Sequence, residues 1–185
     1  MVERILIAGA GGQGILLVGK ILAEAAMREG RFVTWLPAYG AEVRGGTAHC
    51  MVVISDEEIA SPFIETADCL IAMNEPSFVR FSAKVRAGGL VLINSSLIPH
   101  PEVRTTVQHL AGPFTETAAG LGNIKVANMI ALGSLIARRR SVCKDTVLAV
   151  IRESAPAGRE ELITVNVSAL AEGVRLASAG EKGGG

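Results

Sequence analysis

The chain has 185 residues, of which 49% are hydrophobic, 19% are charged and only 4% are aromatic. Lys plus Arg and Asp plus Glu both number 18, and this formal net charge of zero argues against nucleic acid or a charged membrane surface as a partner. The three cysteines lie far apart without a Cys-x-x-Cys pair, which argues against a disulfide framework, a zinc site and an iron–sulfur cluster held by this chain alone.

The first predicted element is a buried strand that ends in a glycine-rich loop. Residues 4–14 read RILIAGAGGQG, an apolar run of strand length followed by glycines. Apolar residues then recur at helical spacing after Gly14, and Gly30 is placed to end that helix.

Short apolar strands alternate with helices through the middle of the chain. The further strands are predicted at 31–37 (closed by Pro37), 47–55, 68–73 and 88–96, with another possible at 102–111. The pattern also predicts a turn with a short helix over 56–67 and a helix over 75–85.

The last third of the chain is predicted to be mainly helical. Residues 114–154 should form helices broken near Gly120 and Ser141, and 161–177 a short extended piece followed by a helix. Buried strands between helices favour an α/β fold, an open Rossmann-like, mostly parallel sheet with helices on both faces. We expect one cytoplasmic domain over 1–177 and a flexible Gly-rich tail over 178–185, with no membrane span because the apolar runs are short or glycine-broken.

The glycine loop GAGGQG at 9–14 is a candidate phosphate site. Its spacing fits G-x-G-x-x-G between a strand and a helix, where backbone amides and the helix N-terminus attract an anion. The alternative is a tight turn that only packs the helix on the strand. A dinucleotide fold also needs an acidic residue at the end of the second strand, and Trp35 to Ala38 provide none. Nicotinamide binding is therefore not expected.

A second unusual loop reads AYGAEVRGGTAHC, at 38–50. It has too many glycines and charges for a simple turn, and it belongs to the same sheet edge as 9–14, 73–74 and 94–96. Arg44 could clamp a phosphate or carboxylate, or it could form a salt bridge to Glu42 or to another chain.

A third segment, LGNIKVANMIALG at 121–133, follows these two in order. With GAGGQG and AYGAEVRGGTAHC, it makes the chain resemble the gamma subunit of the 2-oxoacid:ferredoxin oxidoreductases, over residues 3–177. The ketoisovalerate, 2-oxoglutarate and pyruvate enzymes are members of this family.

The resemblance implies a non-catalytic subunit of a larger enzyme. That enzyme oxidatively decarboxylates a 2-oxoacid to acyl-coenzyme A and passes electrons to ferredoxin. Thiamine diphosphate and the iron–sulfur clusters would reside in the partners, which are alpha and beta (thiamine-binding) and delta (ferredoxin-like) subunits. This chain would close the active site and help to bind coenzyme A, and it would be inactive alone.

The resemblance also implies a set of residues near coenzyme A, with no catalytic residue and no metal ligand among them. They are Gly9, Gly11, Gly12, Gln13, Gly14, Lys20, Arg44, Asn94 and Ser95. Asn123, Lys125 and Asn128 of the third motif are interpreted instead as a capped helix start in which Asn128 binds backbone.

Two other functions remain open from the sequence. One is a free-standing nucleotide-binding enzyme, which the Rossmann pattern favours; the other is an interaction domain whose glycine loop is purely structural. No histidine is paired with a nucleophile in a readable way, so a hydrolase triad is not expected. Cys50 and Cys69 are expected to be buried strand residues.

Overall fold

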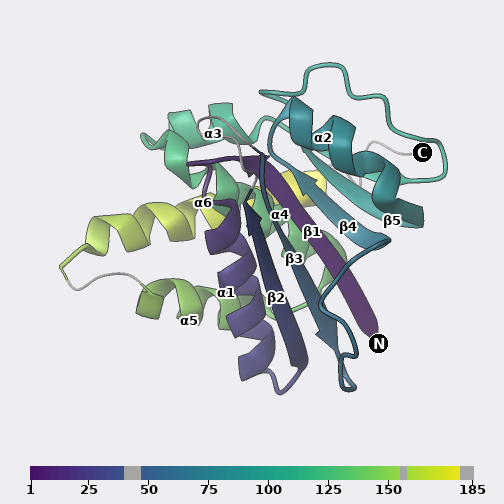
Figure 1. Ribbon diagram of the computed structural model, residues 1–185. Coiled ribbons are helices and arrows are strands. Elements are labelled where there is room, and N and C mark those ends of the chain that lie inside the picture. Colours follow the sequence, from purple (N-terminus) through teal and green to yellow (C-terminus); the bar gives the residue numbers. More distant parts are fainter. Residues whose placement is uncertain (40–46, 155–157, 180–185) are drawn as a thin grey trace.

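A computed structural model describes residues 1–39, 47–154 and 158–179. Its centre is a six-stranded sheet in the order β2-β3-β1-β4-β5-β6 (Figure 1). The strands are β1 (Val2–Ala10), β2 (Phe32–Tyr39), β3 (Thr47–Ser55), β4 (Ala67–Ala72), β5 (Val85–Asn94) and β6 (Gln108–Gly112). The helices are α1 (Ile15–Arg28), α2 (Glu75–Phe81), α3 (Phe114–Gly120), α4 (Ala127–Arg139), α5 (Lys144–Ser154) and α6 (Glu160–Ala179), with short 3₁₀ turns η1 (Ser82–Lys84) and η2 (Ile124–Val126).

The sheet is mostly parallel, as predicted, with β3 as the exception. The pairs β1–β4, β4–β5 and β5–β6 are parallel, whereas β3 is antiparallel to both β1 and β2. A parallel connection needs about a dozen residues or more, and only residues 40–46 join β2 to β3. The chain therefore returns beside β2, and β3 lies between β2 and β1.

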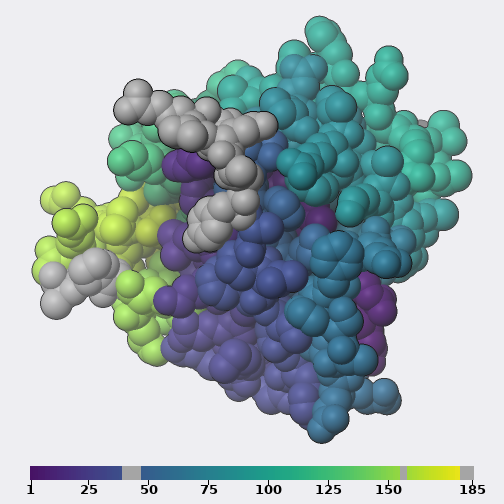
Figure 2. Space-filling model, viewed as in Figure 1, coloured from purple at the N-terminus to yellow at the C-terminus, as the bar shows by residue number. Residues whose placement is uncertain are grey.

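Helices cover both faces of the sheet, unequally. One core packs α1, α3, α4, α5 and α6 on the face that carries Ile5, Ile7 and Val52. The other core places α2 and the loops over Leu6, Ala8 and neighbouring residues of the opposite face. Successive side chains of β1 and β3 alternate between these cores, as the two-residue period of a strand requires. Figure 2 shows α1 and the β2–β3 edge as one continuous purple and blue face.

The helices α4 and α6 cross at two glycines. A Cβ atom built on Gly133 would lie 2.1 Å from the carbonyl oxygen of Leu170, and one on Gly173 would lie 1.9 Å from that of Ile130. The Ser134 hydroxyl donates within this crossing, at 3.0 Å from the Gly173 oxygen and 3.1 Å from the Ile130 oxygen. The backbones of the two helices are thus in direct contact.

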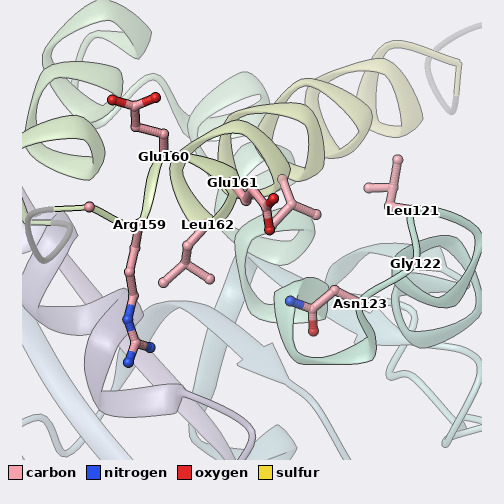
Figure 3. A pocket seen from close by; sticks show the side chains of 9 residues that line it. Leu121, Gly122, Asn123, Arg159, Glu160, Glu161 and Leu162 are labelled. Carbon is pink, nitrogen blue, oxygen red and sulfur yellow. The ribbon is translucent and has the colours of Figure 1, made fainter.

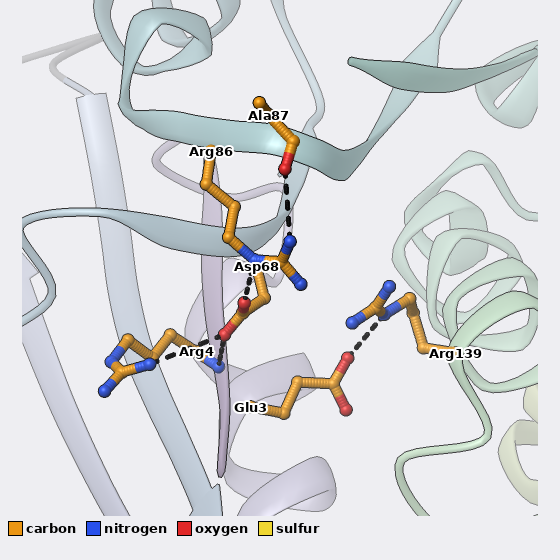
Figure 4. Close-up of polar contacts among 6 residues, drawn as sticks. All are labelled: Glu3, Arg4, Asp68, Arg86, Ala87 and Arg139. Carbon is orange, nitrogen blue, oxygen red and sulfur yellow. Dashed lines mark hydrogen bonds and ion pairs between the residues drawn. The ribbon is translucent and has the colours of Figure 1, made fainter. Parts of the chain in front are cut away.

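Ion pairs lie at the amino edge of the sheet, where the parallel strands begin, opposite to the glycine loop (Figure 4). Arg139, at the end of α4, donates from Nε to the buried Glu3 carboxylate at 2.6 Å. Asp68 accepts from the Arg86 guanidinium and from the Arg4 backbone amide, the latter at 2.8 Å. These contacts join α4 and β5 to the start of β1.

Residues 56–66 contain no helix, which corrects the short helix predicted over 56–67. Proline restricts the residue before it to extended conformations, and Pro62 stands in the middle of this segment. The Ser61 hydroxyl accepts the Phe63 amide at 3.1 Å, a local turn contact that competes with helical hydrogen bonding.

The extended piece predicted at the start of 161–177 is also wrong, because α6 is one continuous helix. β-Branched residues such as Val165 and Val167 favour strands, but here they pack against the main core from the helix. Tertiary packing overrides this weak local preference. The helix runs to Ala179, so that Ser178 and Ala179 are helical and the rest of the predicted tail lies outside the described residues.

The strand β2 extends past Pro37 to Tyr39, two residues beyond its predicted end. Proline is tolerated there because β2 is an edge strand, whose outer side has no ladder partner in the sheet. Within the described ranges, no helix combines the length and hydropathy that a membrane span requires.

Candidate functional site

Hydrogen bonds connect the carboxyl ends of the parallel strands β1, β4 and β5. The Met73 carbonyl, just after β4, accepts the Asn94 side-chain amide at 3.1 Å and the Gln13 side-chain amide at 3.4 Å. The Met73 backbone amide donates to the Ala8 carbonyl of β1 at 2.9 Å. The tips 9–14, 73–74 and 94–96 therefore meet at one edge, as the switch-point rule predicts.

Gln13 fixes the shape of the glycine loop. Its side-chain oxygen accepts the Ala10 amide at 2.7 Å, and a Cβ atom on Gly9 would lie 2.6 Å from that oxygen. Gly9 is therefore required by close packing. Gly11 and Gly12, in contrast, are exposed, and a Cβ on either would meet nothing within 4 Å. The outer half of the loop is open to an approaching molecule.

Asn128 holds the other end of the loop. Its side-chain amide donates to the Gly14 carbonyl at 3.2 Å, and a Cβ atom on Gly14 would lie 2.2 Å from the Asn128 nitrogen. Asn123 accepts the Lys125 amide at 3.1 Å and so caps η2. The interpretation of this motif as a helix start whose Asn128 binds backbone is confirmed, and the backbone it binds is that of the glycine loop.

The loop forms one wall of a cavity of about 250 Å³. The cavity is open toward solvent between the glycine loop, the end of β4, the start of α3 and η2. Its lining residues are Gly12, Gln13, Met73, Leu97, Thr115, Ile124, Lys125 and Ala127. The only charge in this set is the Lys125 ammonium, so the cavity is suited to a ligand with an anionic group.

Asn94 and Ser95 lie beside this cavity but not in its lining. Asn94 is fully buried. Its side-chain amide donates to the Met73 carbonyl and to the Thr115 hydroxyl, and its side-chain oxygen accepts the Thr115 backbone amide. The Ser95 amide donates to the Gly112 carbonyl at 2.9 Å. In this conformation both residues position Thr115 and β6, and a ligand in the cavity would meet Thr115 before it meets Asn94.

Arg44 and Lys20 are the two basic residues that the sequence predicts near the ligand. Arg44 lies outside the described residues. Lys20 is exposed on α1 and lines a different groove, of about 540 Å³, between α1 and β2. The structure therefore does not bring Lys20 together with the glycine loop.

Six residues that line the cavity are not among those that the sequence predicts near coenzyme A: Met73, Leu97, Thr115, Ile124, Lys125 and Ala127. Lys125 and Ile124 were visible as part of the third motif, LGNIKVANMIALG, although only the capping asparagines had a readable role. Thr115 and Leu97 gave no signal, because what places them is the packing of α3 and the loop after β5 on the strand ends.

A larger hollow, of about 720 Å³, lies between residues 121–123 and the start of α6 (Figure 3). Its polar side chains include Glu160 and Glu161 as well as Arg159, and in Figure 3 Glu160 and Arg159 point in opposite directions. Two carboxylates disfavour an anionic ligand there, so its size alone does not make it the phosphate site.

The two buried cysteines are not placed to act as nucleophiles or metal ligands. Cys50 and Cys69 are buried in β3 and β4, as predicted, and Cys143 is exposed. Burial raises the pKa of the Cys50 thiol to about 12 and also raises the pKa of the Cys69 thiol, so both remain protonated. In the part of the chain that the structure describes, no cluster of His, Cys, Asp and Glu could hold a metal ion.

Residues 4–176 match the family model described as "Pyruvate ferredoxin/flavodoxin oxidoreductase". The chain belongs to this family. It is 38% identical to the ketoisovalerate oxidoreductase subunit VorA of Methanothermobacter thermautotrophicus over 94% of this chain but only 36% of that subunit. It is 33% identical to the 2-oxoglutarate synthase subunit KorC of Methanothermobacter marburgensis over 98% of this chain and 100% of that subunit.

Solved structures of the family share the fold. The gamma subunit of a keto/oxoacid ferredoxin oxidoreductase from Geobacter sulfurreducens has a TM-score of 0.83 and 31% identity, over 96% of this chain and 99% of that chain. The 2-oxoglutarate:ferredoxin oxidoreductase of Magnetococcus marinus, with 2-oxoglutarate, coenzyme A and succinyl-coenzyme A bound, has a TM-score of 0.90 and 27% identity, over 96% of this chain and 31% of that chain. The resemblance to gamma subunits that the three motifs indicated is thus confirmed, and this chain spans about a third of the VorA and Magnetococcus chains.

Proposed function

We propose that this chain is the gamma subunit of a 2-oxoacid:ferredoxin oxidoreductase and that it closes the active site and helps to bind coenzyme A. The observation that carries the proposal is the glycine-walled cavity with Lys125, at the carboxyl edge of the sheet, in a chain of this family. The coenzyme A bound in the Magnetococcus enzyme supports the choice of ligand. The whole complex would convert a 2-oxoacid to acyl-coenzyme A and pass electrons to ferredoxin.

The partners would supply the groups that carry the redox chemistry. We assign thiamine diphosphate to alpha and beta subunits and the iron–sulfur clusters to a delta subunit, with contacts to neither nucleic acid nor membrane. The cysteines of this chain support this division, because three scattered thiols are fewer than the four that a cluster usually needs.

Ketoisovalerate and 2-oxoglutarate are the proposed substrates of the complex, since VorA and KorC relatives match this chain at 38% and 33% identity. Arg44 remains a proposed anchor for coenzyme A or for the subunit interface. Its charge-assisted contact would be worth roughly 1.5–3 kcal/mol, so Arg44→Ala should raise the KM for coenzyme A about ten- to a hundredfold.

Reconstitution tests the proposed function. The chain is coexpressed with the thiamine-binding and ferredoxin-like subunits of its own organism, and coenzyme A-dependent reduction of ferredoxin is followed with ketoisovalerate and with 2-oxoglutarate. We expect one stable complex whose turnover requires this chain, while the isolated chain is inactive. A complex that forms and turns over equally well without this chain contradicts the proposal.

The free-standing nicotinamide enzyme is not favoured by the fold. Besides the missing carboxylate, β3 separates β2 from β1, so that the end of β2 is displaced from the glycine loop by one more strand, about 4.8 Å. Calorimetry of the isolated chain with NAD and NADP should therefore show no binding in the millimolar range.

A further inference from the structure

The outermost strand β2 is poorly protected against pairing with another chain. Natural proteins usually protect edge strands by making them short or by placing charged side chains or proline on them. The other edge strand, β6, follows this rule, because it has only five residues and includes the exposed Gln108 and His109. In contrast, β2 has eight residues, none of them charged, and its one proline is Pro37 near its end. Within the described residues, no strand pairs with the outer side of β2.

Hydrogen bonds of β1 show which backbone groups of β2 face outward. The Arg4 amide donates to the Asp68 carboxylate of β4 at 2.8 Å, and the Ala8 carbonyl accepts the amide of Met73, just after β4, at 2.9 Å. Even-numbered residues of β1 thus direct their backbone toward β4, and odd-numbered ones toward β3, because successive residues of a strand alternate sides. The two antiparallel registers carry this alternation across β3. Even-numbered residues of β2 therefore bond to β3, and odd-numbered ones face outward.

A second copy of β2, related by a two-fold axis through Thr34, matches these outward groups. Val33 of one copy then lies opposite Trp35 of the other, and each of the two pairs forms two backbone hydrogen bonds. A shift of two residues in one direction places Pro37 opposite Val33, whose carbonyl would have no donor. The opposite shift places Arg31 opposite Trp35, but the Arg31 amide already donates within its own chain. Of these three registers, the one centred on Thr34 pairs every outward group of Val33 and Trp35.

The side chains fit the same register. The two Thr34 side chains lie directly opposite each other as a non-hydrogen-bonded pair, the kind whose side chains are closer. The Thr34 hydroxyl is buried and has no hydrogen-bond partner in the described part of the chain, and threonines paired across strands can bond to each other. On this face Phe32 also meets Leu36 of the other copy. On the face of α1, Val33 meets Trp35.

We infer that β2 is an interaction surface for a second copy of this chain. The two β2 strands pair antiparallel, in the register centred on Thr34, and join two six-stranded sheets into one continuous sheet. The two α1 helices then lie on the same face of this sheet, one from each copy. The inference does not depend on the ligand proposed above, because it uses only the outer side of β2.

The surface on and beside β2 carries exposed apolar area for such a contact. Phe32 and Trp35 are 46% and 38% exposed, and Met27, which lines the groove between α1 and β2, is 63% exposed. Aromatic side chains carry about 150–250 Å² each, so the exposed parts of Phe32 and Trp35 amount to roughly 250–420 Å² in two copies. A specific interface buries about 1,000 Å² or more in total, of which these residues supply roughly a third. The paired backbones and the exposed residues of α1 supply the remainder, so the dimer should be weak and dependent on concentration.

A cysteine at the two-fold axis tests the register in the isolated full-length chain. The Cα atoms of a non-hydrogen-bonded pair lie about 4.5 Å apart, within the range of about 4.4–6.8 Å that a disulfide spans. Cys143→Ser provides the background, because Cys50 and Cys69 are buried. In this background, Thr34→Cys should give a disulfide-linked dimer of twice 19.3 kDa on mild oxidation.

Phe32→Cys is the matched control for the cross-link. It lies on the same face of β2 as Thr34 and is more exposed, so random collisions would cross-link it faster. In the proposed register its two copies are four residues apart along the strands, about 13 Å, which is too far for a disulfide. We therefore expect no rapid cross-link at Phe32→Cys.

Charges at the same position test the contact without a covalent bond. Sedimentation of the wild-type chain at rising concentration should show monomer passing to dimer. Thr34→Lys and Thr34→Glu each place like charges opposite one another, which should raise the dissociation constant of the dimer about tenfold or more. An equimolar mixture of the two variants should recover the dimer, because the facing charges are then opposite. This recovery also shows that both variants are folded.

Other results would overturn the inference. A wild-type chain that stays monomeric at every concentration, with β2 amides protected from exchange only in the reconstituted complex, means that a partner subunit covers β2 instead. Equal cross-linking of Thr34→Cys and Phe32→Cys means that the chains meet by collision. A wild-type dimer that persists in both Thr34→Lys and Thr34→Glu places the contact between copies elsewhere on the surface.

Discussion

At the residue scale, the side chains that shape the glycine loop bind protein rather than point into solvent. Gln13 and Asn94 both donate to the Met73 carbonyl, and Asn128 donates to the Gly14 carbonyl. These three amides connect the strand tips, the loop and α4. The cavity is consequently held open by a rigid frame, which reduces the ordering cost when a ligand enters.

Gly14 and Asn128 give a test of this frame. Gly14 has a φ of 70°, a left-handed conformation that costs other residues about 1–2 kcal/mol. Gly14→Ala should cost more than this in the free energy of unfolding, because the new methyl group also collides with Asn128. In an Asn128→Ala background the collision is absent, and Gly14→Ala should cost only the conformational strain. Urea unfolding of the four chains measures the difference, and strictly additive effects would contradict the contact.

The cysteines give a second test at this scale. Cys143 is exposed, while Cys50 and Cys69 are buried and have pKa values raised by burial. Because the thiolate is the reactive form, a thiol reagent at pH 8 should label Cys143 alone in the folded chain and all three residues in denaturant. Cys143→Ser should abolish the rapid labelling. Rapid reaction of Cys50 or Cys69 in that variant would show that the sheet opens.

The residue roles were predicted only in part from the sequence. The glycines of 9–14 were recognised because their spacing between a strand and a helix carries a local meaning. Gln13 and Asn94 were predicted to face coenzyme A, but their partner, the Met73 carbonyl, lies far away in sequence. A local pattern cannot show that an amide is already satisfied by such a distant group.

At the element scale, the glycine crossing of α4 and α6 determines how the main helical layer packs. A methyl group at Gly133 or Gly173 would lie within about 2 Å of a backbone oxygen of the other helix, so the helices must separate. Overpacking of a core typically costs about 1–3 kcal/mol. We expect Gly133→Ala and Gly173→Ala to reach the upper part of this range in chemical unfolding.

Gly120→Ala is the control for that experiment. Gly120 is the last residue of α3, and a methyl group there would meet nothing within 4 Å. Alanine is the better helix former by roughly 0.5–1 kcal/mol, so this variant should be neutral or slightly more stable. Equal destabilisation by all three substitutions would mean that the crossing has no special role.

Helices and strands with a clear hydrophobic periodicity are predicted well from the sequence. Features that depend on contacts with distant parts of the chain are not. The strand 47–55 and the helix breaks near Gly120 and Ser141 follow from local pattern and agree with the structure. The antiparallel direction of β3 and the helical start of α6 depend on partners that only the folded chain supplies, namely β1 and the core beneath Val165.

At the scale of the whole molecule, the end of the sheet where the parallel strands begin differs from the end where they finish. We call these the amino edge and the carboxyl edge. The amino edge is closed by the Glu3–Arg139 and Asp68–Arg86 ion pairs. The carboxyl edge presents exposed glycines, exposed Leu97 and Ile124, and the Lys125 charge around a cavity. Such an edge is suited to be covered by a ligand and a partner subunit, which is the role proposed here.

Hydrogen exchange of the reconstituted complex, with and without saturating coenzyme A, tests this role most directly. We predict that coenzyme A slows exchange of the backbone amides at 11–14 and 124–127, which border the cavity, because a bound ligand excludes water and restricts local opening. The amides of α5, at 144–154, should be unaffected. Protection confined to the partner subunits, with unchanged exchange at 11–14 and 124–127, would contradict the claim that this chain binds coenzyme A.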